Sequence, residues 1–242
     1  MTTVVISQPM YFPWAGFLDL MRHADVLIWL DDVQFSKGSF TNRVQVKLPS
    51  GTPWMTVPLE GKGTGQKIAD LRAAGDGWIS SHRAMLTQSL AKYPFAQRAL
   101  DVFDATTGPA LPLNETLIRS AELLLEALDL PLPPRRRASD MGVQDRSWQR
   151  VLDLVRAAGG TRYLSAAGGA RYILHEAFDA AGIAVVYADY DFTPWPQGHG
   201  SFTPFVTGLD LLASRGSEGV RHLGARLVPW ADYLPMKGIA PQ

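Results

Sequence analysis

The 242-residue sequence contains no cysteine. This absence excludes thiol nucleophiles, disulfide bonds, iron–sulfur clusters and thiolate zinc sites. The sequence also lacks an excess of either charge, because 23 Lys and Arg side chains balance 23 Asp and Glu side chains. We therefore expect neither a broad nucleic-acid-binding surface nor strong attraction to an anionic membrane.

Long apolar runs are absent too, since none reaches the roughly 18 residues that span a bilayer. The first residues, MTTVVISQP, lack a basic segment, and their apolar run is too short for a signal peptide. No two histidines have the spacing of metal ligands, and HExxH is missing. We expect a cytoplasmic protein without membrane insertion and without a dedicated metal site.

Strand-like and helix-like segments alternate along the chain. VVIS (4–7) and VLIWL (26–30) are short apolar runs separated by the helical pattern WAGFLDLMRHAD (14–25). This is the order of a strand–helix–strand unit. Because both runs are almost continuously apolar, their strands should be covered on both faces. TRYLS (161–165) and IAVVYADY (183–190) repeat the rhythm, so we predict an α/β fold with a mostly parallel sheet flanked by helices.

An insertion interrupts this rhythm. NRVQVKL (42–48) and TPWMTVPL (52–59) flank a Pro-Ser-Gly turn and predict a β-hairpin. A helical middle segment is expected at about 77–130, followed by a linker at about 131–140. The linker contains three consecutive arginines (135–137), which we interpret as solvated and not as a binding patch. The chain should form one α/β domain over residues 1–242.

Four loops should follow the carboxyl ends of the strands, where ligands bind in open parallel sheets. Their sequences are SQPMYFPWAG, DDVQFSKGSFTNR, LSAAGG and DFTPWPQGHGSF. If these loops converge, they form a pocket with aromatic surfaces and polar anchors, which suits a sugar or a nucleotide. The candidate substrate-binding residues are Gln8, Tyr11, Trp14, Gln34, Asn42, Arg43, Ser165 and Gln197.

For several of these residues a structural role is the alternative. Tyr11 and Trp14 could be core aromatics, which supply large buried area. Gln8 is harder to explain by packing, because a buried amide needs hydrogen-bond partners. Arg43 could form a surface ion pair, or present its donor fork to a carboxylate or a phosphate.

Three residues are candidates for acid–base catalysis. In Asp31-Asp32 adjacent side chains should point to opposite faces, so one enters the pocket, and we favour Asp32. The alternative is a strand end with one solvated carboxylate. His199 lies in a Gly-His-Gly loop and His82 in a helical segment. Histidine titrates near neutrality and serves as a general base, although an isolated histidine is often structural.

Two glycine-rich segments give weaker indications. GKGTGQK (61–67) lacks the GxxxxGK[ST] pattern and is interpreted as a flexible loop. AAGGARY (166–172) follows a strand and opens a predicted helix over 167–182, so its amides could bind an anion. It lacks the full dinucleotide-binding pattern. YLSA does not match GxSxG, so a hydrolase nucleophile elbow is unsupported.

Taken together, the loops resemble the WbqC-like protein family of bacterial O-antigen and natural-product gene clusters. The resemblance runs from about Ile6 to Gly216 and rests on QPMYFPWAGFLDL, DDVQFSKGSFTNR, YLSAAGGARY and PQGHGSFTPFVTGLDLLASRG. It implies a single α/β domain and an association with glycan assembly. By this resemblance His82 and Ser165 match family positions, and Tyr172 joins the substrate-binding candidates. The chain departs from the family at Ala166, where glycine is usual.

A weaker analogy links the first strand, loop and helix to pantothenate-synthetase-type ligases. Those proteins bind ATP through two histidines, whereas this chain has Trp14 and Phe17 at the corresponding places. Such fold analogy does not by itself support ATP-driven adenylation.

The resulting functional hypothesis is an intracellular transferase of glycan or natural-product biosynthesis. It would modify an amino-sugar or another amine-bearing small molecule, plausibly by amide formation. Its partner would be a small molecule, such as a nucleotide-sugar or an activated acyl donor, while the cofactor and the oligomeric state are left open. The alternatives are a non-catalytic scaffold of a biosynthetic complex and an ATP-using amide ligase.

Overall fold

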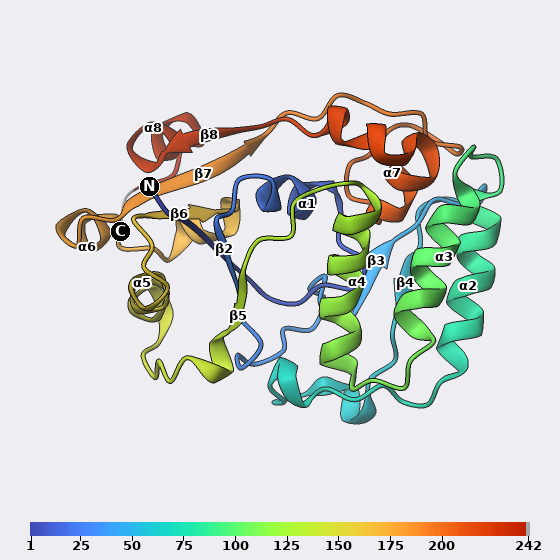
Figure 1. Ribbon diagram of the computed structural model, residues 1–242, viewed down its shortest axis with the longest axis horizontal. Coiled ribbons are helices and arrows are strands. Elements are labelled where there is room, and N and C mark those ends of the chain that lie inside the picture. The colour runs from blue at the N-terminus through green and yellow to red at the C-terminus, as the bar shows by residue number, and fades with distance from the viewer. Residues whose placement is uncertain (241–242) are drawn as a thin grey trace.

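The computed structural model describes residues 1–240 and is built on a six-stranded sheet (Figure 1). Across the sheet the strands are β5 (Arg135–Arg137), β2 (Val26–Trp29), β1 (Thr3–Ser7), β6 (Arg162–Ser165), β7 (Ala184–Tyr190) and β8 (Ala225–Pro229). Neighbours are parallel except β7 and β8, which pair antiparallel. The predicted α/β class with a mostly parallel sheet is confirmed.

The strand order makes the sheet doubly wound. With its strands numbered along the chain, the sheet reads 3-2-1-4-5-6, the order of dinucleotide-binding sheets. From β1 the chain passes through α1 (Ala15–Met21) to β2, whereas α5 (Ser147–Ala157) leads it back to β6 on the other side of β1. The carboxyl ends of β1 and β6 therefore flank the switch point, where ligands bind in such sheets.

Each face of the sheet is covered by its own helices, as the alternation of strand side chains requires. Val5 belongs to the larger core cluster and its neighbour Val4 to the other. The larger cluster includes residues of α1, α4 (Leu113–Ala127) and α7 (Gly208–Arg215), and the other includes residues of α5, α6 (His175–Ala180) and α8 (Trp230–Met236).

The predicted insertion forms the side of the molecule opposite α5 and α6 (Figure 1). Its hairpin is an antiparallel pair, β3 (Arg43–Gln45) and β4 (Trp54–Thr56). Two short 3-10 helices follow, η1 (Glu60–Gly63) and η2 (Ile68–Asp70). The helical middle segment consists of α2 (Gly77–Leu90), α3 (Ala96–Thr107) and α4, which lie together in the ribbon view.

Two segments differ from the sequence-based expectation. The expected linker at 131–140 contains the edge strand β5, and its three arginines are accommodated because Glu122 and Glu115 pair with the first and the third. The helix predicted over 167–182 is a 3-10 turn, η4 (Ala167–Arg171), followed by the short α6. This turn packs closely on β6: a Cβ at Gly169 would lie 2.2 Å from the hydroxyl of Ser165.

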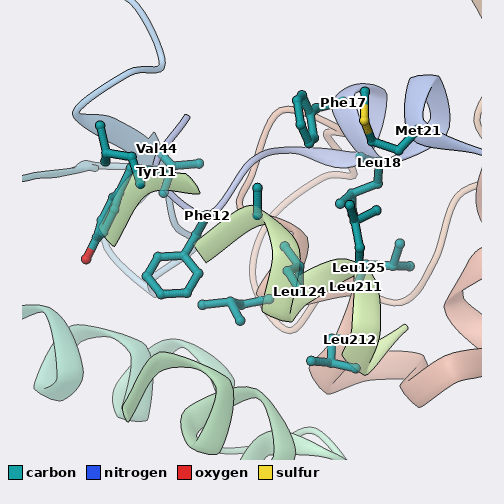
Figure 2. Packing of buried hydrophobic residues seen from close by; sticks show 14 of the residues in the cluster. Tyr11, Phe12, Phe17, Leu18, Met21, Val44, Leu124, Leu125, Leu211 and Leu212 are labelled. Atoms are coloured by element: carbon teal, nitrogen blue, oxygen red, sulfur yellow. The ribbon is translucent and has the colours of Figure 1, made fainter. Parts of the chain in front are cut away.

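The Pro-rich loop after β1 contains an unusual backbone conformation at Phe12. Its φ is 41°, in the left-handed region that bulky residues rarely adopt. The Phe12 amide donates to the Ser120 hydroxyl (2.9 Å), and its carbonyl accepts from the Thr207 hydroxyl (3.0 Å). The buried ring stacks on Phe103 and lies beside Leu124 of α4 (Figure 2). Two hydroxyls thus hold the loop against α4 and α7.

Ser120→Ala should destabilise the protein by about 1–3 kcal/mol, because the amide of Phe12 would be buried without a partner. Urea denaturation monitored by circular dichroism measures the change. The matched control is Ser80→Ala, whose hydroxyl lies on the exposed side of α2, and it should change stability by less than about 0.5 kcal/mol. Equal stabilities of the two variants would contradict this role of Ser120.

Candidate functional site

Aromatic side chains from three of the four predicted loops and from the hairpin meet around Trp14. We call this group the Trp14 cluster; it consists of Trp14, Phe40, Trp54, Tyr190, Phe192 and Phe205. The ring centroid of Trp14 lies 5.3 Å from that of Tyr190 and 5.4 Å from that of Phe205. The cluster lies at the carboxyl edge of the sheet, since Trp14 follows β1 and Tyr190 ends β7.

Backbone hydrogen bonds hold the same segments together. The amide of Tyr11 donates to the carbonyl of Phe40 (3.2 Å), which joins the first loop to the second. The amide of Gly208 donates to Pro13 (2.9 Å), and that of Thr207 to Gln45 (2.9 Å). The first loop therefore contacts the second through the Tyr11–Phe40 backbone bond, and it contacts the fourth through the rings of Trp14 and Phe192.

Gly16 allows the indole of Trp14 to lie directly on the backbone of α1. A Cβ at Gly16 would be only 2.1 Å from the outer edge of that indole. Because the ring occupies the space of a side chain, glycine is required at this position for the observed orientation of Trp14.

Arg43 supplies a cation to the Trp14 cluster. Its guanidinium lies 4.0 Å from the ring centroid of Trp54, a cation–π contact, and it also donates to the carbonyl of Gly38. Trp54 is 37% exposed and Phe205 50% exposed. The cluster thus offers partly exposed aromatic rings beside a guanidinium, a combination that can pack on a sugar or a planar group and bind a carboxylate or a phosphate.

The loop at 197–203 is closed by Gln197. Its side-chain amide donates to the carbonyl of Thr203 (2.8 Å) and accepts from the amide of Thr203 (3.0 Å). The amide of Gly198 donates to the hydroxyl of Tyr93. Gln197 therefore shapes this loop, and His199 sits partly exposed in its middle.

A network of buried polar side chains packs against the loop at 197–203. The carboxylate of Asp210 accepts from the indole of Trp195 (2.7 Å) and from the hydroxyl of Tyr93 (2.9 Å), while Lys47 donates to the carbonyl of Ser201. Burial raises the pKa of Asp210 and lowers that of Lys47. Asp210 lies in the segment PQGHGSFTPFVTGLDLLASRG that carries the family resemblance, whereas no pattern in the sequence indicated Lys47 or Tyr93.

His82 and Tyr11 form a buried pair whose hydrogen bonds are all internal. The Nε2 atom of His82 lies 3.2 Å from the carbonyl of Thr56, which can only accept, so Nε2 carries the proton. Nδ1 then accepts from the Tyr11 hydroxyl at 3.0 Å. Burial lowers the pKa of His82 to about 4. These contacts favour the structural alternative for both residues, and neither enters the function proposed below.

The two aspartates after β2 have separate partners. The buried carboxylate of Asp31 accepts from the amide (3.1 Å) and the hydroxyl (2.9 Å) of Ser139. Asp32 pairs with Arg150 of α5 at 2.5 Å. Its other carboxylate oxygen is buried and has no hydrogen-bond partner. No sequence signal indicated Arg150, because its pairing depends on how α5 packs.

The remaining predicted residues are dispersed. Asn42 is buried, and its side chain donates to the carbonyl of Val57 (2.8 Å). This bond links the two strands of the hairpin. Gln34 is exposed and pairs by its backbone with Lys67. Gln8 is half-buried just after β1.

In the third loop Ser165 and Tyr172 both contact Tyr163 and not the Trp14 cluster. Tyr163 is hydrogen-bonded to each of them, and burial raises the pKa of its hydroxyl well above the usual value. The Ser165 hydroxyl also donates to the carbonyl of Ala166 (3.0 Å). The departure at Ala166 leaves the close packing of this loop intact, because Gly169 provides it.

Five cavities in residues 1–240 were compared with the positions of the polar candidates. One has a volume of about 570 Å³ and lies between η2, Trp78 and the start of α4. Another, of about 400 Å³, lies at the ends of β6 and β7. None of these five cavities is lined by Gln8, Asp32, Arg43 or Gln197.

Within residues 1–240, no three His, Asp or Glu side chains gather into a group that could ligate a metal ion. The helices of that part of the chain include none with the length and apolarity required to cross a membrane.

The strand order and the loops at the carboxyl edge define a doubly wound α/β protein with an aromatic cluster beside its switch point. The model of the WbqC-like protein family matches residues 8–222, and the chain belongs to that family. It is 32% identical over 227 residues to a Mycobacterium tuberculosis protein described as "Uncharacterized protein Rv1507c". The match covers 92% of this chain and 98% of that protein. No solved structure matches.

The low pKa of His82 should make stability depend on pH. The folded state takes up a proton at about pH 4, whereas an unfolded histidine does so near pH 6.5. The unfolded state binds more protons between these values, so stability falls as the pH drops. Linkage gives a loss of about 2 kcal/mol between pH 7.5 and pH 5.

Urea denaturation at a series of pH values measures this dependence. In the variant His82→Gln most of this loss of stability between pH 7.5 and pH 5 should disappear, whereas the control His222→Gln, at a half-buried histidine, should keep the wild-type pH dependence. An unaltered pH dependence in His82→Gln would show that His82 is not the titrating group.

Gly16→Ala should displace the indole of Trp14 from α1, since the added methyl group would overlap it. We expect a loss of about 1–3 kcal/mol in stability together with a shift in tryptophan fluorescence. The matched control is Gly77→Ala at the start of α2, where an added methyl group meets nothing within 4 Å. If Gly16→Ala behaves like this control, the orientation of Trp14 described above is incorrect.

Proposed function

We propose that the protein is a transferase of glycan or natural-product biosynthesis that modifies an amine-bearing sugar, by forming an amide. The observation that carries this proposal is the convergence of three loops on the Trp14 cluster, with Arg43 stacked on Trp54. Membership of the WbqC-like family supports the glycan setting. The amine and the amide are inferences of our own.

The sugar is proposed to bind against the open faces of Trp54 and Phe205. An aromatic face provides apolar contact for a sugar ring, and a few polar groups then fix its orientation. Arg43 would supply one of these groups, because its guanidinium lies against the ring of Trp54. Its fork geometry suits a carboxylate or phosphate on the substrate.

His199 is the proposed general base. The amine nitrogen would attack the carbonyl carbon of the acyl donor, a C–N bond would form, and the bond to the leaving group would break. The proton released from the amine would pass to His199. The closed loop at 197–203 favours this role, because a base must be held within hydrogen-bond reach of its proton. Asp32 is less suited to accept a proton, since its carboxylate is paired with Arg150.

Two alternatives make different predictions. A non-catalytic binding module would bind the sugar at the Trp14 cluster without turnover; the structural roles of Gln197, Asn42 and His82 favour it. The ATP-using ligase is less well supported, because Phe17 is buried and stacks on Trp29 where a phosphate-contacting histidine would be required. No rise in melting temperature with millimolar ATP would count further against the ligase.

Turnover of amino-sugar nucleotides with activated acyl donors tests the proposal. Trp54→Ala and Arg43→Gln should each lower kcat/KM at least about tenfold, or about 1.4 kcal/mol of transition-state stabilisation. His199→Gln should act mainly on kcat. The matched control is Phe95→Ala, which removes a similarly exposed ring outside the Trp14 cluster and should keep wild-type activity.

If both Trp54→Ala and Arg43→Gln turn over substrate at the wild-type rate, the Trp14 cluster is not the substrate site. If sugar binding depends on Trp54 but no activated acyl donor supports turnover, the binding module is favoured instead.

A further inference from the structure

The cavity of about 570 Å³ between η2, Trp78 and the start of α4 has no part in the function proposed above. Its volume falls within the roughly 300–1,000 Å³ that is typical of small-molecule sites. Its charged lining residues are Glu60 of η1, Asp70 of η2 and Arg72, and its apolar lining includes Trp78 of α2 and Leu111. None of these residues belongs to the Trp14 cluster, so the cavity is independent of the proposed transferase site.

The three charged side chains of this cavity are not used within the protein. In residues 1–240, no ion pair and no side-chain hydrogen bond involves Glu60, Asp70 or Arg72. By contrast, each arginine or lysine that lines the other four cavities has a partner within the protein. The two carboxylates and the guanidinium are therefore available to a ligand.

The backbone brings these three residues together on neighbouring segments. Leu71 is buried and has an extended backbone, with a φ of −62° and a ψ of 138°. Because side chains alternate in direction along an extended chain, the exposed residues Asp70 and Arg72 on either side of it point away from the core. The amide of Glu60 donates to the carbonyl of Arg72 (3.0 Å), which places the second carboxylate beside them.

The apolar part of the lining is held in place by buried groups. The ring centroid of Trp78 lies 6.0 Å from that of Tyr11 and 5.3 Å from that of His82, in both cases edge to face. The indole is half-buried, and Leu111 is 42% exposed. A methylene chain that ends in an ammonium group suits such a lining, because methylenes pack on apolar surface and a cation is attracted to an indole face.

The charges of the lining define the ligand. Two carboxylates and one guanidinium are balanced by two cations and one anion, and an α-amino acid with a basic side chain carries these groups on one short methylene chain. A guanidinium also matches the geometry of a carboxylate. We propose that this cavity binds a free basic α-amino acid, such as lysine or ornithine. Its carboxylate would lie on Arg72, its two ammonium groups on Glu60 and Asp70, and its methylenes on Trp78.

Titration of the isotope-labelled full chain with L-lysine, followed by the indole N–H resonance of Trp78 in NMR spectra, tests the site. The resonance is assigned by its loss in Trp78→Phe, and it should shift saturably as lysine is added. The variants Glu60→Gln, Asp70→Asn and Arg72→Gln should each weaken binding about threefold or more, as expected for ion pairs that are open to solvent.

The matched controls are Asp145→Asn and Arg146→Gln, which remove exposed charges outside the cavity. Both should keep the wild-type affinity for lysine. Arg43→Gln should also keep it, although this variant is expected to impair the proposed transferase. Failure of the amino-acid site and failure of the transferase proposal are therefore distinguishable.

Two analogues of lysine assign the individual contacts. Cadaverine lacks the carboxylate and norleucine lacks the side-chain ammonium group, so each should bind the wild-type protein about threefold or more weakly than lysine. In Arg72→Gln the difference between lysine and cadaverine should disappear, because the partner of the carboxylate is gone.

The absence of a saturable shift with lysine, or equal affinities in the wild type and the three cavity variants, would overturn the site. Cadaverine binding as tightly as lysine would overturn the contact between Arg72 and a carboxylate. Norleucine binding as tightly as lysine would overturn the assignment of a basic side chain.

Discussion

The left-handed turn at Phe12 is the constraint on which the carboxyl edge of the sheet depends. Its amide and carbonyl are held by hydroxyls of α4 and of the residue preceding α7, which are far apart in sequence. A bulky residue in this conformation costs on the order of 1–3 kcal/mol, so the surrounding contacts must offset it. By holding the Pro-rich loop to α4 and to the start of α7, the turn sets the position of Trp14 at the start of α1. The aromatic loops assemble around that position.

The polar residues at this edge of the sheet fall into two groups. Some are hydrogen-bonded within the protein and hold the loops in place, and others are accessible to a ligand. Asn42 links the two strands of the hairpin, Gln197 closes the loop at 197–203, and His82 is hydrogen-bonded to Tyr11. Side chains committed in this way contribute rigidity, which a binding site requires if a ligand is to be held in one orientation. Arg43, His199 and the exposed faces of Trp54 and Phe205 are left to meet a ligand, which is why the proposed chemistry is assigned to them.

The sequence predicted much of the fold because its strands are apolar runs and its helices have regular periodicity. The edge strand β5 could not be found this way, since its three arginines fit no strand pattern and depend on carboxylates supplied by α4. The position of the loops at one edge of the sheet was predictable from their place after parallel strands. Which side chains are used internally was not, because the partners of Asp32, His82 and Gln197 are set by tertiary packing.

The most direct test of a ligand site at the Trp14 cluster is a crystal structure of the protein soaked with a nucleotide-activated amino-sugar. The account predicts electron density for the sugar ring against Trp54 and Phe205, with Arg43 within hydrogen-bond distance of the ligand. Density confined to the cavity between η2 and α4, with the aromatic faces of the Trp14 cluster unoccupied, would contradict it.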